Sequence, residues 1–220
     1  MGRRVIFLGL AGEAKTFSES AGRRRADEIW TVNDWYQRIP RVRTPDRVFN
    51  IHADITNHAT DLNRFTGDTI KEYNESGAEI VTSRYFPELD NCRPFDLLKL
   101  IDIRRDPFFS STLAVMFVMA WLECWEEIEL VGVVLGHDTE FDVQVPAVVG
   151  AIHESERRGI QVIAPHREAW AKRGVVVAPW KNNGCPHAPY WMEQYQLSDA
   201  PGVTKASADR PLPYKIFEKV

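Results

Sequence analysis

The sequence lacks the cysteine patterns that zinc sites and disulfide frameworks require. Its three cysteines, Cys92, Cys124 and Cys185, are widely spaced and odd in number, and no CxxC pair occurs among the 220 residues. This usage is typical of a reducing compartment. The sequence also lacks an excess of positive charge, since its formal net charge is −4. No global basic field is therefore available to attract nucleic acid.

Long apolar runs and common catalytic motifs are missing as well. The apolar run at residues 113–122 is about half as long as the roughly 20 residues that a transmembrane helix needs. The short apolar run near the N-terminus is typical of a strand and not of a signal peptide. We therefore expect a soluble, cytoplasmic protein with no membrane partner. The absence of SxxK, GxSxG, HExxH and P-loop motifs argues against the common hydrolase and NTPase classes.

Short β-rich runs alternate with helical stretches, and this order predicts an α/β fold. Apolar, β-branched runs are typical of strands buried on both faces of a parallel sheet. We expect a Rossmann-like three-layer fold with a mostly parallel sheet. Strands are expected at residues 5–8, 29–32, 47–51, 78–81, 128–134 and 160–164, and helices at 13–20, 62–76, 113–122 and 145–158. Residues 1–175 would form this nucleotide-binding domain, and the Pro- and aromatic-rich residues 176–220 an irregular C-terminal extension acting as a lid, arm or interface.

Small and polar residues follow the first three expected strands. Gly9 and Gly12 lie in the turn after the first strand, where small residues let a ligand approach the backbone. This turn does not complete a GxGxxG motif, so a plain strand-to-helix turn stays equally open. Asn33 and Asp34 follow the second strand, and His52 follows the third. Strand ends of a parallel sheet share one edge, where ligands bind, although helix capping and a core histidine remain open for these residues.

The stretch at residues 108–146 carries most of the remaining candidates. It reads as a buried helix with hydroxyls at its start, a strand, and a polar loop. A glycine in the strand suggests close backbone approach. Helix capping and a solvated loop are the structural alternatives. The candidates are Ser110, Ser111, Thr112, Gly132, His137, Asp138, Glu140 and Gln144.

The chain also resembles a known family through several segments in order. They are "IWTVNDWY", "DRVFNIHAD", "FFSSTLAVMFVMAWLECWEEIELVGV" and "EFDVQVPAVVGAIHESERRGIQVIAP". Together they resemble phage- and prophage-encoded Rossmann-like proteins of unassigned activity. The fold of that family is similar to those of CMP-sialic-acid-dependent bacterial sialyltransferases and hydroxymethylpterin diphosphokinase-like proteins. The resemblance covers about residues 5–165.

The resemblance carries over to particular positions. Asn33-Asp34, His52, Ser110-Ser111-Thr112, Glu140-Phe141 and Gln144-Val145-Pro146 stand where the family has equivalent residues. In the sialyltransferase-like relatives, an Asn near the position of Asn33 meets the nucleotide. The chain departs from the family after the first strand, where Ala11-Gly12-Glu13 has neither Pro nor Ser, and after the central strand, where Asp138 comes late.

These observations lead to three functional hypotheses. The first is a nucleotide-sugar-dependent glycosyltransferase, phage-encoded and acting on a hydroxymethylated base in DNA, by analogy of fold and setting. His52 or His137 would take the acceptor proton, Asp138 and Glu140 would act as bases or bind a divalent metal, and Asn33 and Gln144 would read the base or sugar. The donor, the need for a metal and homo-oligomerisation stay open. The second hypothesis is a non-catalytic protein that binds a nucleotide or a host protein, and the third is a diphosphokinase-like transferase.

Overall fold

A computed structural model describes residues 2–51, 68–96, 111–135 and 139–172 of the chain. All of them belong to one compact unit, Met1–Pro179. The predicted boundary between residues 175 and 176 lies outside the described residues. No helix in the described ranges is long and apolar enough to cross a membrane.

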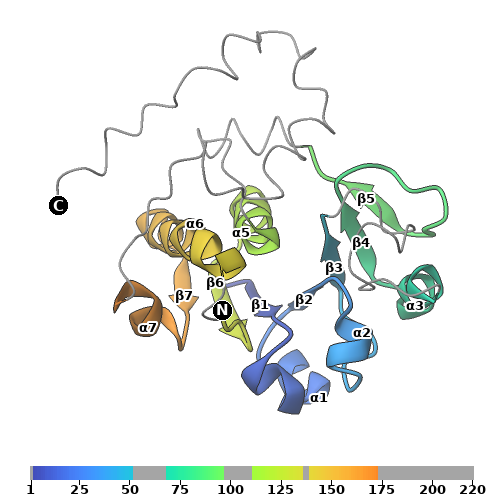
Figure 1. Cartoon of the computed structure of the whole chain (residues 1–220), viewed down its shortest axis with the longest axis horizontal. Helices are drawn as coiled ribbons and strands as arrows, with labels where there is room; N and C mark the ends of the chain where they lie inside the picture. Colours follow the sequence, from blue (N-terminus) through green and yellow to red (C-terminus); the bar gives the residue numbers. More distant parts are fainter. Residues whose placement is uncertain (1, 52–67, 97–110, 136–138, 173–220) are drawn as a thin grey trace, which may run out of the picture. The chain divides into compact units, whose positions relative to one another are not determined.

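Seven parallel strands form one sheet in the order β5-β4-β3-β2-β1-β6-β7 (Figure 1). All six neighbouring pairs are parallel, and most strand residues are buried, which accounts for their continuous apolar runs. The predicted α/β Rossmann-like fold with a parallel sheet is confirmed. The strands are β1 (Arg4–Leu8), β2 (Glu28–Val32), β3 (Arg47–Asn50), β4 (Glu79–Thr82), β5 (Cys92–Pro94), β6 (Glu127–Val131) and β7 (Gln161–Ile163).

The order of the strands reverses between β1 and β6. From β1 the chain adds β2, β3, β4 and β5 towards one side, then returns and adds β6 and β7 on the other side of β1. Chain segments leaving β1 and β6 therefore turn to opposite faces of the sheet. Ligands of open α/β sheets bind outside the carboxyl ends of the strands at such a topological switch point.

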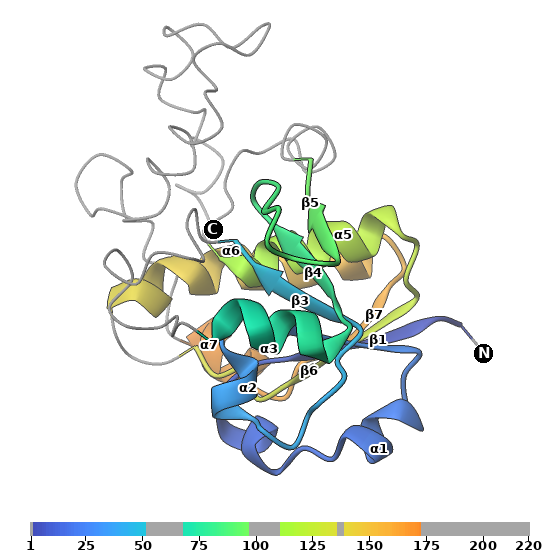
Figure 2. The same ribbon diagram turned by 90° about the vertical axis from the view of Figure 1, so that its right-hand side faces the viewer.

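Helices cover both faces of the sheet. The long helices α5 (Thr112–Leu122) and α6 (Thr139–Arg157) pack together on one face (Figures 1 and 2). The 3₁₀ turn η1 (Gly12–Thr16) and the short helices α1 (Glu19–Arg23), α2 (Trp35–Arg38) and α3 (Thr69–Ser76) lie on the other face. A last helix, α7 (Arg167–Lys172), follows β7.

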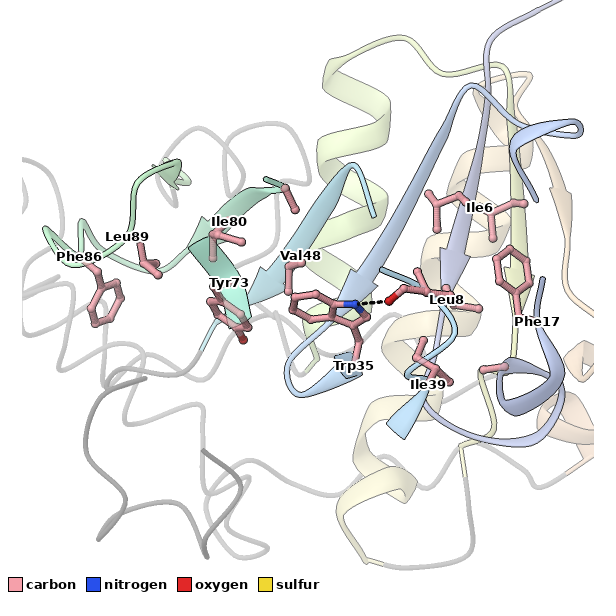
Figure 3. Close-up of a cluster of buried hydrophobic side chains, with 14 residues drawn as sticks. Ile6, Leu8, Phe17, Trp35, Ile39, Val48, Tyr73, Ile80, Phe86 and Leu89 are labelled. Carbon is pink, nitrogen blue, oxygen red and sulfur yellow. Dashed lines mark hydrogen bonds between the residues drawn. The ribbon is translucent and has the colours of Figure 1, made fainter. Parts of the chain in front are cut away.

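Alternate residues of the strands fill two separate cores. Under α5, Phe7 stacks on Trp30 and meets Phe117 edge to face, with ring centroids 5.3 and 5.2 Å apart. On the other face, neighbouring strand residues such as Ile6 and Leu8 pack with Trp35 in the cluster shown in Figure 3. The indole N–H of Trp35 donates to the carbonyl of Val42 at 3.1 Å, which satisfies its polar atom inside this cluster.

An ion-pair network joins the amino ends of the strands. Arg47, at the start of β3, pairs with Glu28 of β2 at 3.2 Å, Glu79 of β4 at 3.1 Å and Glu123 after α5 at 2.6 Å. Its guanidinium also lies 4.6 Å from the ring centre of Trp30. Because one cation binds three carboxylates from separate elements, this network fixes the edge of the sheet opposite the strand carboxyl ends.

Several expected elements differ from those observed. The helix predicted at residues 13–20 is divided into η1 and α1, and β5 was not predicted. The strand predicted at residues 128–134 ends at Val131, so Gly132 follows the strand with φ +61° instead of lying within it. Helix α6 begins at Thr139, before the expected residue 145, and therefore includes Glu140, which was predicted in a loop. Gly77 ends α3 in the left-handed conformation.

Candidate functional site

The backbone segments after β1 and β6 are hydrogen-bonded to one another at the switch point. The N–H of Gly9 donates to the carbonyl of Val131 at 2.8 Å, and the N–H of Ala11 donates to that of Gly132 at 3.2 Å. These bonds continue the β1–β6 pairing beyond the strands. Two backbone N–H groups of the turn after β1 therefore already make hydrogen bonds within the protein.

Glycine is required on both sides of this contact. A Cβ on Gly9 would lie 2.3 Å from the carbonyl oxygen of Gly132. A Cβ on Gly132 would lie 2.3 Å from the carbonyl oxygen of Ala11 and 2.6 Å from the backbone nitrogen of Ala14. The φ of +61° at Gly132 is a second reason for glycine. The close approach inferred from the sequence at Gly132 is therefore an approach of one backbone segment to another.

A carboxylate and an imidazole meet next to this junction. Glu13, in η1, lies 3.3 Å from the buried Nε2 of His166, which precedes α7. Hydrogen bonding from its own backbone lowers the pKa of Glu13, with further lowering from His166 and the backbone of Gly132, so Glu13 is ionised at neutral pH. His166 also lies beside Trp170, with ring centroids 6.3 Å apart. The pair joins the chain segment that follows β1 to the segment that follows β7. Strand β6 lies between β1 and β7 in the sheet, so the pair spans its carboxyl end.

A buried polar cluster lies at the carboxyl ends of β2 and β3. Tyr73 of α3 donates its hydroxyl proton to the carbonyl of Asn33 at 2.9 Å and accepts from Nδ2 of Asn50 at 2.8 Å. Burial raises the pKa of Tyr73, so its hydroxyl stays protonated. Asn33 has φ +44°, and its Oδ1 is buried without a hydrogen-bond donor among the described residues. A buried amide oxygen of this kind is an acceptor available to a ligand.

Asp34 and Ser111, two of the candidates from the sequence, make local contacts at the starts of helices α2 and α5. Asp34 is 3% exposed, is the N-cap residue before α2 and pairs with Arg38 at 3.1 Å, but its side chain makes no capping bond. Ser111 is the N-cap of α5, where its hydroxyl accepts from the N–H of Ala114 at 3.3 Å. Thr112 is the first residue of that helix. The capping role that the sequence left open is therefore filled by Ser111.

The parallel topology brings most described candidates to one edge of the sheet. Gly9, Asn33 and Gly132 follow the carboxyl ends of β1, β2 and β6, and Gly12 begins η1. The helices that connect parallel strands run back from this edge, so the N-termini of α5 and α6 lie there too. Glu140 is in the first turn of α6 and Gln144 lies further along it. The candidates His52, Ser110, His137 and Asp138 lie outside the described residues.

Sequence reasoning missed Glu13 and His166 as site residues, and likewise Tyr73 and Asn50. Glu13 and His166 both follow strand ends, so the rule that selected Asn33 could have found them. Asn50 is the last residue of β3, inside an apolar run, and Tyr73 lies on the buried side of α3. Nothing in the local sequence distinguishes these two from ordinary core residues.

Comparisons with protein-family models, curated proteins and solved structures gave no match. Within the described ranges, no group of three or more His, Cys, Asp or Glu side chains could hold a metal ion. The functional interpretation therefore depends on the geometry at the carboxyl ends of the strands.

Proposed function

We propose that the protein binds a nucleotide sugar at the carboxyl ends of β1, β2 and β6 and transfers the sugar to a hydroxyl group. The observation that carries this proposal is the reversal of strand order between β1 and β6, with a buried acceptor, Asn33 Oδ1, that has no donor among the described residues at the neighbouring end of β2. Open parallel sheets bind nucleotides at such points.

The end of β2 supports recognition of the nucleoside. The backbone of Asn33 is held from two sides, because its N–H donates to the carbonyl of Phe49 at 3.1 Å and its carbonyl accepts from Tyr73. The backbone from which this side chain projects is thereby held in place. An exocyclic amine of a base or a ribose hydroxyl would supply a hydrogen-bond donor to Asn33 Oδ1.

The phosphate groups would bind on the α5 and α6 side of the edge. The N–H groups of Gly9 and Ala11 already donate to the carbonyls of Val131 and Gly132. In contrast, the first N–H groups of a long helix lack intrahelical partners and favour negative charge. Helices α5 and α6, of 11 and 19 residues, both begin at the carboxyl edge.

The transfer reaction needs an acceptor hydroxyl, and a hydroxymethylated base in DNA is the first acceptor to test. In the reaction the acceptor oxygen bonds to the anomeric carbon and loses its proton, while the bond between that carbon and the donor phosphate oxygen breaks. The electron pair of that bond leaves with the nucleotide. The need for a divalent metal is tested in the same assay by adding Mg²⁺ or a chelator.

Thermal shift measurements with CMP-, UDP- and GDP-sugars test the proposal. A ligand at about 100 times its Kd stabilises the folded state by about 2.7 kcal/mol, which corresponds to roughly 5–10 °C in Tm for a chain of this size. N33G should lose this shift, because glycine keeps the positive φ of Asn33 and removes Oδ1. R93A, at the amino end of the sheet, is the control and should keep the shift.

Three outcomes separate the hypotheses. No shift with any nucleotide sugar contradicts the proposal. A shift that N33G loses, with the donor intact after long incubation with hydroxymethylated DNA, indicates the non-catalytic binding protein. Release of AMP from ATP would identify the diphosphokinase-like alternative.

A further inference from the structure

The Glu13–His166 pair is an ionisable pair beside the switch point, on the segments that follow β1 and β7. Glu13 is exposed, and His166 lies on the segment between β7 and α7. The structural ion pairs around Arg47 lie at the opposite, amino edge of the sheet. Chemistry on a bound ligand is expected at the carboxyl edge, where this pair lies.

We propose that His166 is the proton acceptor of the sugar transfer and that Glu13 is the residue that positions its ring. This assignment rests on the proposed function. The acceptor hydroxyl would give its proton to Nδ1 of His166 as its oxygen bonds to the anomeric carbon, and the nucleotide would leave with the electron pair of the broken bond. Neither residue was among the candidates from sequence.

The geometry selects Nδ1 as the accepting atom. Nε2 is buried and faces Oε1 of Glu13 at 3.3 Å, whereas the side chain of His166 as a whole is 35% exposed. Its exposed surface therefore belongs to other atoms of the ring. Nε2 makes no hydrogen bond among the described residues at this distance, and a small approach of Glu13 on ligand binding would bring the Nε2 proton to the carboxylate and leave Nδ1 unprotonated in the neutral ring. The long Nε2–Oε1 distance is normal for a site without ligand, where such bonds tighten on binding.

The ring is restrained on further sides. Trp170 is 3% exposed, and its backbone N–H donates to the carbonyl of His166 at 3.1 Å, which fixes the start of α7 against the imidazole. Arg167 pairs with Glu156 of α6, so its charge is engaged away from the imidazole. Glu13 is the charged group that contacts the ring among the described residues.

Distances along the sheet edge fit a nucleotide sugar. Neighbouring strands are about 4.8 Å apart, so the ends of β2 and β7, separated by β1 and β6, lie roughly 14 Å apart. An extended nucleotide sugar is of comparable length. With the nucleoside at Asn33, the sugar would reach the segment that holds Glu13 and His166.

Nitrogen-15 NMR of the imidazole rings tests the geometry without any assay of transfer. We expect neutral His166 to carry its proton on Nε2 and to leave Nδ1 bare, and we expect E13A to give a mixture of the two tautomers. H166Q assigns the signal, and H153Q, at an exposed histidine of α6, is the control. A wild-type ring with its proton on Nδ1, or a tautomer unaffected by E13A, overturns the positioning role of Glu13.

Kinetics with the donor identified by thermal shift test the proton transfer. H166Q should lower kcat by about 10²–10⁴-fold, the usual contribution of a general base, with the donor-induced shift in Tm unchanged. H166A should regain part of its activity when imidazole is added, which a structural role would not allow. E13Q should fall between wild type and H166Q in kcat at unchanged KM, and E13D should recover activity.

The two proposals fail by different results. Wild-type kcat in H166Q overturns the role of His166 and leaves nucleotide-sugar transfer intact. Absence of any donor-induced shift in the wild-type protein contradicts the proposed function, and the role of His166 in that transfer falls with it.

Discussion

Gly132→Ala and Gly77→Ala form a matched pair that tests the packing of the switch point. Both glycines have positive φ, +61° and +68°, so each alanine carries a similar left-handed penalty of about 1–2 kcal/mol. A Cβ at Gly77 meets nothing within 4 Å, whereas one at Gly132 meets backbone atoms of Ala11 and Ala14 at 2.3 and 2.6 Å. Backbone in a paired segment cannot move as freely as the end of a side chain.

The steric difference should therefore appear in the free energy of unfolding. Overpacking costs about 1–3 kcal/mol, so G132A should lose about 2–5 kcal/mol in total and G77A about 1–2 kcal/mol. Urea unfolding measures both values directly, and the difference corresponds to roughly 2–12 °C in Tm for a chain of this length. Equal losses in the two variants would refute the inferred backbone contact at the junction.

Further predictions concern the buried polar groups. Tyr73→Phe should destabilise by about 1–3 kcal/mol in urea unfolding, because the carbonyl of Asn33 loses the hydroxyl that donates to it and the amide of Asn50 loses one hydrogen bond; no loss would contradict these contacts. Arg47→Met should cost roughly 3 kcal/mol, since Glu28, Glu79 and Glu123 lose the most buried of their arginine partners, whereas the more exposed Arg93→Met should cost under about 1 kcal/mol; equal costs would refute this. Burial would raise the pKa of Glu123, but the contacts with Arg47, Trp125 and Arg93 together outweigh it, and the pKa is lowered from 4.5. Ionised Glu123 therefore stabilises the folded state above pH 4.5, and this contribution is lost as the pH falls through the lowered pKa. Glu123→Gln should make the free energy of unfolding fall less steeply with decreasing pH. An unchanged dependence on pH would contradict this prediction.

Much of the fold follows from local sequence patterns. Continuous apolar runs predicted the positions of β1, β2, β3, β4, β6 and β7, and their flanking polar residues predicted a parallel sheet with one functional edge. Strand β5 was missed because Cys92–Pro94 is three residues long and includes a proline, so the run has no apolar period. The order of the strands depends on contacts between distant segments, which no local pattern encodes.

The site was predictable only where residues follow strands directly. Asn33 and Gly132 were found in this way, although only the structure shows the left-handed conformation of Asn33 and that its Oδ1 has no hydrogen bond within the described part of the chain. The pairing of Glu13 with His166 joins residues 153 positions apart and depends on β1 and β7 flanking β6. Residue spacing carries no information about such a contact.

A crystal structure of the protein with the nucleotide sugar that gives the largest thermal shift is the most direct test of the central claim. The claim predicts the nucleoside within hydrogen-bonding distance of Asn33 Oδ1 and the sugar beside His166, along the carboxyl ends of β2, β1 and β6. A nucleotide bound at the amino ends of the strands, next to Arg47 and Arg93, would contradict it.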